Sequence, residues 1–297
     1  MAVVAPAGTM IGSSGDIDRP FYIRSSAKPF QATVSQEAGA DLTPLEMAVA
    51  CASHRGFPAH IALVSSMLRV AGLDESALQC PPAWPLASEA SRLVVRRGGS
   101  EPRRVWHNCS GKHAGFLRAC VAAGWPTESY LSPDHPLQRR VVALVSELGE
   151  YQVEPVGVDG CGAPVLRTTV TAMALMFAKL ATERRLEHAR AAMHQYPALV
   201  AANGEGDTEI AITLDGVAKG GAAGCVGVGL RDRLGLAVKS WDGLGTVANL
   251  GAVAALDQVG ALTPTALAAL ESTMRPPVFG GGRLVGHLES RLVLEMT

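Results

Sequence analysis

Two residues near the start of the chain could form a nucleophile and its base. In the stretch Arg24–Phe30, Ser25 and Lys28 are three positions apart. If a helix begins here, residues three apart share a face, so the amine is within reach of the hydroxyl. A neutral lysine can take the proton that makes serine nucleophilic, provided that burial or a nearby cation lowers its usual pKa of ~10.4. By itself this spacing also fits a solvated start of a helix.

A second serine and a second lysine could take part in the same chemistry. Ser53 stands at the end of a predicted helix, beside His54-Arg55-Gly56, where a helix terminator is the simpler interpretation. Lys219 precedes two glycines next to a predicted strand, where a solvated lysine is the simpler one. Glycines there would let a ligand approach the backbone closely. The absence of an obvious carboxylate partner in the sequence suits a lysine whose pKa must fall.

Cys109, Lys112 and Cys161 form a third group of interest. Two thiolates suit zinc, but four-coordinate zinc sites usually draw on cysteine, histidine or carboxylate ligands. Spacing alone favours two buried cysteines and an anion-binding lysine. Other motifs fail, because Trp106 replaces the first glycine of a phosphate-binding loop and His113 replaces its Ser or Thr.

Composition narrows the class of protein. The 297 residues carry a net charge of -1, which gives no reason to expect nucleic acid or an anionic membrane as a partner. No apolar run reaches 18 residues, so no transmembrane helix is predicted, and the first residues lack the features of a signal peptide. The six dispersed cysteines favour cytoplasmic thiols. We predict a single domain over residues 1–297.

The elements that would position these residues alternate between strands and helices. Because strands come first and last with many helices between them, the sequence predicts an α+β fold with a mostly antiparallel sheet built from both chain ends. Strands are predicted at 2–4, 9–12, 21–23, 156–164, 216–222, 225–230, 234–238 and 284–288. Helices are predicted at 25–39, 45–53, 60–71, 88–97, 114–123, 136–148, 169–183, 186–196, 246–259 and 263–271.

Taken together, these blocks resemble the rhizobial-type (class 3) L-asparaginases of the asparaginase II-like family. The resemblance covers nearly the whole chain, and the blocks occur in the family's order. They are Arg24-Ser25-Ser26-Ala27-Lys28-Pro29-Phe30-Gln31, Cys51-Ala52-Ser53-His54-x-Gly56, Asn108-Cys109-Ser110-Gly111-Lys112-His113-Ala114-Gly115, Val158-Asp159-Gly160-Cys161-Gly162-Ala163-Pro164, Ala218-Lys219-Gly220-Gly221-Ala222 and Asp242-Gly243.

The resemblance implies an amidohydrolase that converts L-asparagine to L-aspartate and ammonia, usually as a homodimer. It implies a fold like that of serine β-lactamases and penicillin-binding proteins. Two Ser-Lys pairs are implied, Ser25 with Lys28 and Ser53 with Lys219. The family's zinc site maps to Cys109, Lys112 and Cys161, and its substrate pocket to Arg24, His113 and Asp159.

The chain departs from the family's pattern in three places. Its first segment is expected to be shorter than in the family. Phe57 replaces an acidic residue, and the stretch 203–208 keeps Asp207-Thr208 but lacks the usual preceding arginine and aromatic residue. Two other functions therefore stay open, a serine acyl-enzyme of β-lactamase or peptidase type and an inactive ligand-binding relative.

Overall fold

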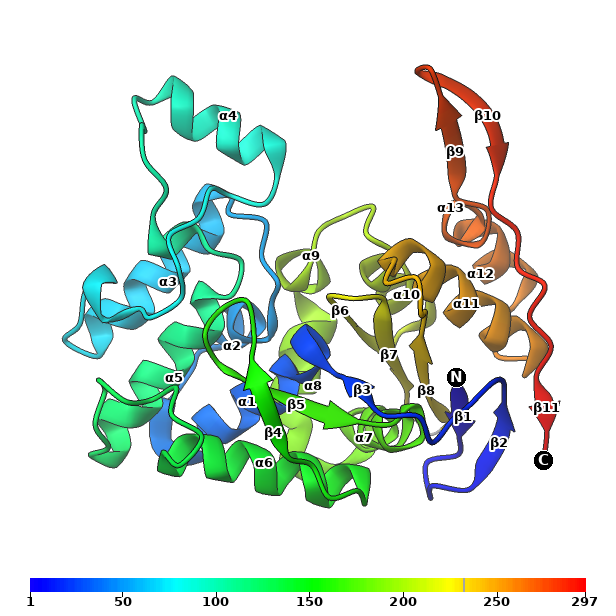
Figure 1. The fold of residues 1–297 in the computed structure, drawn as a ribbon, viewed down its shortest axis with the longest axis horizontal. Helices are drawn as coiled ribbons and strands as arrows, with labels where there is room; N and C mark the ends of the chain where they lie inside the picture. The colour runs from blue at the N-terminus through cyan, green and yellow to red at the C-terminus, as the bar shows by residue number, and fades with distance from the viewer. Residues whose placement is uncertain (232) are drawn as a thin grey trace.

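The computed structural model describes residues 1–231 and 233–297, and its main element is a six-stranded antiparallel sheet (Figure 1). The strand order is β11-β2-β1-β8-β7-β6, so strands from both chain ends pair side by side, as predicted. The strands are β1 (Ala2–Val4), β2 (Met10–Ser13), β6 (Val217–Gly221), β7 (Cys225–Leu230), β8 (Leu234–Lys239) and β11 (Glu295–Met296).

The sheet is covered on both faces by helices, α7 (Val170–Thr182) on one and α11 (Gly245–Gln258) on the other. Successive residues of a strand point to opposite faces, and accordingly Val4 joins the core around α7 while Val3 joins the core under α11. The α7 face is unusually close to the sheet, because a Cβ at Gly227 would lie 2.2 Å from the Phe177 ring.

A helical region lies beside the sheet, on the far side of α7 (Figure 1). Its centre is α1 (Lys28–Ser35), in which every residue is buried and which contacts four neighbouring helices. Lys28, the first residue of this central helix, is therefore held deep inside the protein. The other helices of the region are α2 (Pro44–Cys51), α3 (Pro58–Val70), α4 (Ser88–Arg96), α5 (Ser110–Ala123), α6 (Pro136–Gly149) and α8 (Glu187–Gln195).

Several elements were not predicted from the sequence. Helix α10 (Gly206–Leu214) begins in a glycine-rich stretch that carries no helical period, and strand β9 (Pro277–Gly280) pairs with β10 (Arg283–His287) as a projecting hairpin (Figure 1).

A small sheet has the order β3-β5-β4. The remaining elements are β3 (Phe21–Tyr22), β4 (Pro155–Val158), β5 (Pro164–Thr168), α9 (Pro197–Val200), α12 (Pro264–Ala269) and α13 (Glu271–Met274).

The mixture of helices and an antiparallel sheet confirms the predicted α+β class. In the described part of the chain, no helix combines the length and apolar character needed to cross a bilayer.

Candidate active site

A cavity of about 240 Å³ lies where the edge strand β6 meets the helical region, and three of the four predicted catalytic residues line it. Ser25, Ser53 and Lys219 come from segments that are far apart in the sequence. Lys28 is not among the lining residues, but its amine is hydrogen-bonded to Ser53, which lines the cavity. The structure thus brings the two serines and two lysines together.

Ser25 lies in a short 3-10 turn, Arg24–Ala27, that precedes α1. The turn begins with Arg24 at a φ of 50°, a left-handed conformation that non-glycine residues seldom adopt. Two long-range contacts hold it there: an ion pair from Arg24 to Asp159, and a hydrogen bond of 2.9 Å from the Ser26 hydroxyl to the Lys219 carbonyl. Ser25 is only partly buried, and no hydrogen bond of its hydroxyl occurs among the described residues.

The Lys28 amine points at the end of α2 and not at Ser25. It donates to the carbonyl of Ala52 at 2.6 Å and to the Ser53 hydroxyl at 3.1 Å, with a longer contact of 3.5 Å to the carbonyl of Asn108. The first of these bonds satisfies a carbonyl that the end of the helix leaves without an intrahelical partner. The pairing in the structure therefore differs from the expected one, since Lys28 is bonded to Ser53.

Ser53 lies in a segment without regular secondary structure, residues 52–57, that connects α2 to α3. The helix predicted over 45–53 ends at Cys51, because Ala52 has an extended backbone (φ −82°, ψ 151°). Backbone hydrogen bonds from Ser53 to Val200 and from His54 to Asn108 hold the segment in place. Its position is thus set by distant parts of the chain, which the local sequence does not show.

Lys219 lies on β6, opposite Gly227 of β7, and its side chain is almost completely buried. Burial lowers the pKa of its amine from 10.5 to about 8, with Asp207 opposing the shift and the charge of Lys28 adding to it. The amine donates to the Gly220 carbonyl at 2.7 Å and lies 3.9 Å from the Asp207 carboxylate. Lys219 is therefore partly neutral near neutral pH, as a general base requires.

Asp207, which the sequence did not place beside Lys219, anchors the loop around it. Its two carboxylate oxygens accept hydrogen bonds from the backbone N–H groups of Thr208 and Gly220. The expectation that Lys219 lacks a carboxylate partner was based on neighbours in sequence, and it does not hold in space, because α10 carries Asp207 to the end of β6.

The expected substrate residues Arg24 and Asp159 are bonded to each other. Arg24 Nε lies 2.6 Å from Asp159 Oδ1, and this same oxygen accepts the N–H of Gly160 at 2.7 Å. Neither residue belongs to the lining of the 240 Å³ cavity. In this structure their contact fixes the turn that carries Ser25.

Cys109, Lys112 and Cys161 meet in one buried cluster, as expected for the predicted metal ligands. The Lys112 amine lies 3.1 Å from the Cys161 sulfur. The contact with Cys109 lowers the pKa of Cys161, and the same contact raises that of Cys109, so the two thiols titrate as a linked pair. Burial by itself would lower the pKa of the Lys112 amine. The nearby sulfurs of Cys161 and Cys109 outweigh this effect, so the pKa is raised.

His113 lies beside this cluster and not in the cavity lining. Its Nδ1 is 2.7 Å from the Tyr130 hydroxyl, whereas its buried Nε2 has no hydrogen-bond partner in the described structure. Burial lowers the pKa of His113, and the Cys161 sulfur acts against this shift.

Besides Asp207, two charged residues of the cavity wall were not predicted as site residues. Arg55 and Glu205 both line the cavity and form an ion pair. Little in the sequence indicates that this pair belongs to the site. The one local hint is that Arg55 follows Ser53 by two positions, which would place both side chains on one side of an extended chain. The stretch 203–208 contains no arginine of its own, and the guanidinium of Arg55 reaches Glu205 in it.

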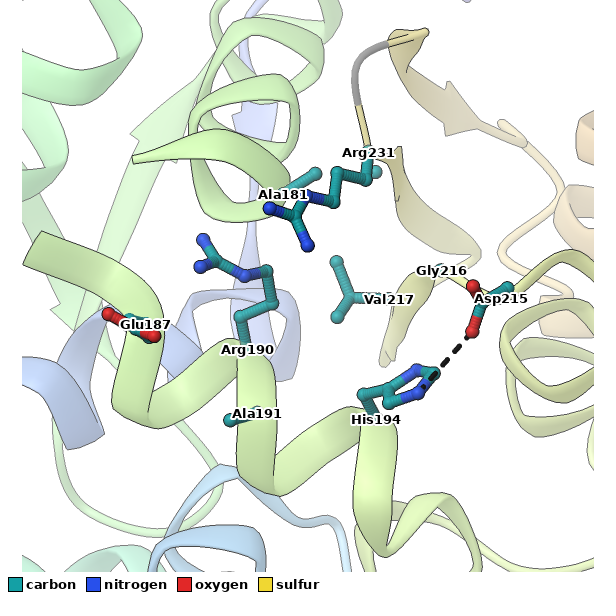
Figure 2. Close-up of a pocket in the computed structure, with 10 residues that line it drawn as sticks. Ala181, Glu187, Arg190, Ala191, His194, Asp215, Gly216, Val217 and Arg231 are labelled. Atoms are coloured by element: carbon teal, nitrogen blue, oxygen red, sulfur yellow. Dashed lines mark ion pairs between the residues drawn. The ribbon is translucent and has the colours of Figure 1, made fainter. Parts of the chain in front are cut away.

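A second cavity, of about 260 Å³, lies between α8 and the outer edge of the sheet (Figure 2). None of the predicted site residues is among those that line it. Arg190 is held there by the carbonyls of Leu180 and Glu183, and His194 lies 3.3 Å from Asp215 on the opposite wall. These contacts stabilise the junction of α7, α8 and β6. The 240 Å³ cavity is the candidate active site because Ser25, Ser53 and Lys219 line it.

The chain belongs to the L-asparaginase II family, because residues 1–290 match the sequence profile of that family. This confirms the resemblance drawn from the motifs. No curated protein matches the chain.

Solved structures similar to the chain include one titled "Crystal Structure Analysis of Mglu", at 16% identity over 88% of this chain and 66% of that chain, with a TM-score of 0.48. Another, titled "Crystal Structure Analysis of Mglu in its glutamate form", has 17% identity over 88% and 60%, with a TM-score of 0.49. This chain therefore spans less than two thirds of the length of each.

Proposed function

We propose that the protein hydrolyses L-asparagine to L-aspartate and ammonia by serine–lysine chemistry. The observation that carries the proposal is the 3.1 Å hydrogen bond between Lys28 and Ser53, at a cavity that Ser25 and Lys219 also line. Membership of the L-asparaginase II family supplies the reaction class. Lys28 and Lys219 lie at the same cavity but make different contacts, and we therefore assign them different roles.

Lys219 is the base in this proposal. With a pKa of about 8, a fraction of its amines is neutral at neutral pH and can accept a proton from a serine hydroxyl. The deprotonated oxygen attacks the amide carbon, the C–N bond breaks, and the proton passes to the departing ammonia. Water, deprotonated by the same amine, then attacks the serine ester, which releases L-aspartate and returns the proton to the serine. Lys28, fixed by the carbonyls of Ala52 and Asn108, holds the Ser53 hydroxyl in place. One serine attacks while the other relays protons or stabilises the oxyanion.

Ammonia release from L-asparagine by the wild-type chain and by Ser25→Ala and Ser53→Ala variants tests the proposal. We expect turnover by the wild type and losses of at least about 100-fold in both variants, as for removal of a general base or an oxyanion donor. Ser66→Ala, on the outer part of α3, is the control and should keep full activity. Turnover unchanged in both site variants would refute the mechanism.

Covalent labelling of Ser25 by a β-lactam separates the competing acyl-enzyme function from this one. Labelling without asparagine turnover would favour a β-lactamase-like or peptidase-like hydrolase. Tight asparagine binding without turnover or labelling would favour an inactive ligand-binding relative.

We further propose that Cys109, Lys112 and Cys161 hold zinc. The described residues contain no group of three or more His, Cys, Asp and Glu side chains placed to hold a metal ion, and this trio brings only two such side chains, both cysteines. Its donors nevertheless fit, because two sulfurs and an amine converge and the unpartnered Nε2 of His113 lies in the same buried region. Bound zinc would supply a fixed positive charge beside the cavity.

Lys112 must lose its proton to bind a metal, so zinc affinity should fall as pH falls. Elemental analysis of protein purified without chelator should find about one zinc per chain, with loss in Cys161→Ser. Protein that contains no zinc under these conditions would refute the metal site.

The architecture suggests a wider relationship. We propose a fold of the serine β-lactamase and penicillin-binding-protein type in a single domain, supported by the Ser-x-x-Lys turn packed against the Lys-Gly-Gly edge strand β6. We also propose a cytoplasmic homodimer. All six cysteines are unpaired thiols, in keeping with a reducing compartment.

A further inference from the structure

Segment 52–57 presents the side chains of residues 53–55 alternately to the cavity and to the core. Ser53 and Arg55 line the cavity, whereas His54 between them is fully buried and lies 2.8 Å from the Ser110 hydroxyl. Neighbouring residues of an extended chain point to opposite sides, and residues two apart are about 7 Å from each other. Arg55 is therefore on the same wall as Ser53, a short distance further along the segment.

Across the cavity, Arg55 is met by Glu205, which immediately precedes α10. The pair is moderately accessible, with 22% of the Arg55 side chain and 45% of the Glu205 side chain exposed. Asn249 of α11 lines the same cavity, and its buried Oδ1 has no hydrogen-bond partner in the described structure. Above the floor formed by the serines, Lys219 and Asp207, the cavity thus offers one cation, one further anion and one unsatisfied acceptor.

We propose that Arg55 and Glu205 bind the charged end of the substrate, Arg55 taking an α-carboxylate and Glu205 an α-ammonium. This inference rests on the proposed function and deepens it, because it restricts the substrates to α-amino acids with a side-chain amide. In the free protein, Arg55 and Glu205 form an ion pair with each other. A zwitterionic ligand replaces this ion pair with two others, one between Arg55 and its carboxylate and one between Glu205 and its ammonium group. Asn249 Oδ1 adds an acceptor for an ammonium group.

Arg24 and Asp159, the residues that the resemblance assigns to this role, are committed to each other. Their bond is short, at 2.6 Å, and both lie outside the cavity lining. The guanidinium of Arg55 presents a planar fork that matches a carboxylate in two parallel hydrogen bonds. The chain thus recognises the amino acid from a different wall than the resemblance implies.

A purely structural role for the pair gives different results. If the pair only connects segment 52–57 to α10, its removal should affect the turnover of every substrate equally and should lower thermal stability. As a recognition site, it affects only ligands that carry the matching charge.

Kinetics with three amides distinguish the two roles: L-asparagine, 3-aminopropanamide, which lacks the α-carboxylate, and succinamate, which lacks the α-ammonium. For Arg55→Gln we expect the KM for L-asparagine to rise about 10- to 100-fold with little change in kcat, the size expected for hydrogen bonds to a charged group. The kcat/KM for 3-aminopropanamide should stay unchanged. Glu205→Gln should likewise leave succinamate unaffected.

Arg185→Gln is the matched control, because it breaks an ion pair with Glu37 at a surface far from the cavity lining. Arg55→Lys, which keeps the charge but loses the fork, should fall between the wild type and Arg55→Gln. Equal losses with all three amides, or an unchanged KM for L-asparagine in Arg55→Gln, would overturn the recognition site.

Calorimetric titration with L-aspartate separates this inference from the proposed function. If the wild type binds L-aspartate and Arg55→Gln binds it at least about tenfold more weakly, the recognition site stands even when no amide is turned over. If the wild type releases ammonia but the affinity for L-aspartate is the same in both proteins, the recognition site fails alone. No binding of L-aspartate by the wild type overturns the recognition site.

Discussion

Replacing Asp207 with asparagine should lower the pKa of Lys219 below its value of about 8. The carboxylate lies 3.9 Å from the Lys219 amine and favours its charged form, in opposition to burial and to Lys28. Removing that negative charge leaves the burial of the amine without its main counterweight. The neutral amine then persists to lower pH, and the acidic limb of the activity profile should move in the same direction.

The geometry sets the size of this effect. Two unit charges about 4 Å apart interact with about 4 kcal/mol at an effective dielectric constant of about 20, which corresponds to roughly three pKa units. Asparagine retains a dipole and still accepts one of the two backbone hydrogen bonds that Asp207 accepts, so part of the interaction survives. We expect a downward shift of roughly one to two units, which places the limb near pH 6 to 7.

Two measurements check this prediction. The pH dependence of kcat/KM reports the free enzyme's essential base, and NMR titration of labelled lysine side chains reports Lys219 without any need for turnover. Asp215→Asn, which removes an exposed carboxylate outside the cavity lining, is the control and should leave both unchanged. A limb that stays at about pH 8, or moves to higher pH in Asp207→Asn, would show that Lys219 is not the base that controls the rate.

Three further substitutions test stability by chemical denaturation. Lys219→Met should raise the free energy of unfolding at pH 7 by up to about 3 kcal/mol, the equivalent of the shift from 10.5 to about 8. Because the native pKa lies below the unfolded one, this gain should shrink as pH rises from 8 to 10.5, and a gain that does not shrink would contradict it. Glu46→Ala should lower the free energy of unfolding by about 3 to 5 kcal/mol, because it leaves the buried charge of Arg118 without its carboxylate partner. A decrease below about 1 kcal/mol would contradict this prediction. Gly227→Ala should cost at least about 1 to 3 kcal/mol by driving a methyl group into the Phe177 ring, and an unchanged midpoint would refute that packing.

The sequence by itself determined the family, the α+β class and most element positions. Strand alternation, proline at the first helical position in 44–51 and glycines after helices are local signals, and they predict elements well because the physics behind them is local. Helix α10 and strand β9 were missed, since glycine-rich stretches carry no such period, whereas the strand predicted at 284–288 is β10 and pairs with β9.

Only the tertiary structure decided which side chains act together. The spacing of Ser25 and Lys28 predicts a contact within one turn, but the Lys28 amine instead satisfies the open carbonyl at the end of α2 and holds Ser53. Partner choice among buried charges depends on which free groups distant segments bring within about 3 Å. No local pattern encodes that distance, and so the pairings of Arg24 with Asp159 and of Arg55 with Glu205 emerge only when the chain is folded.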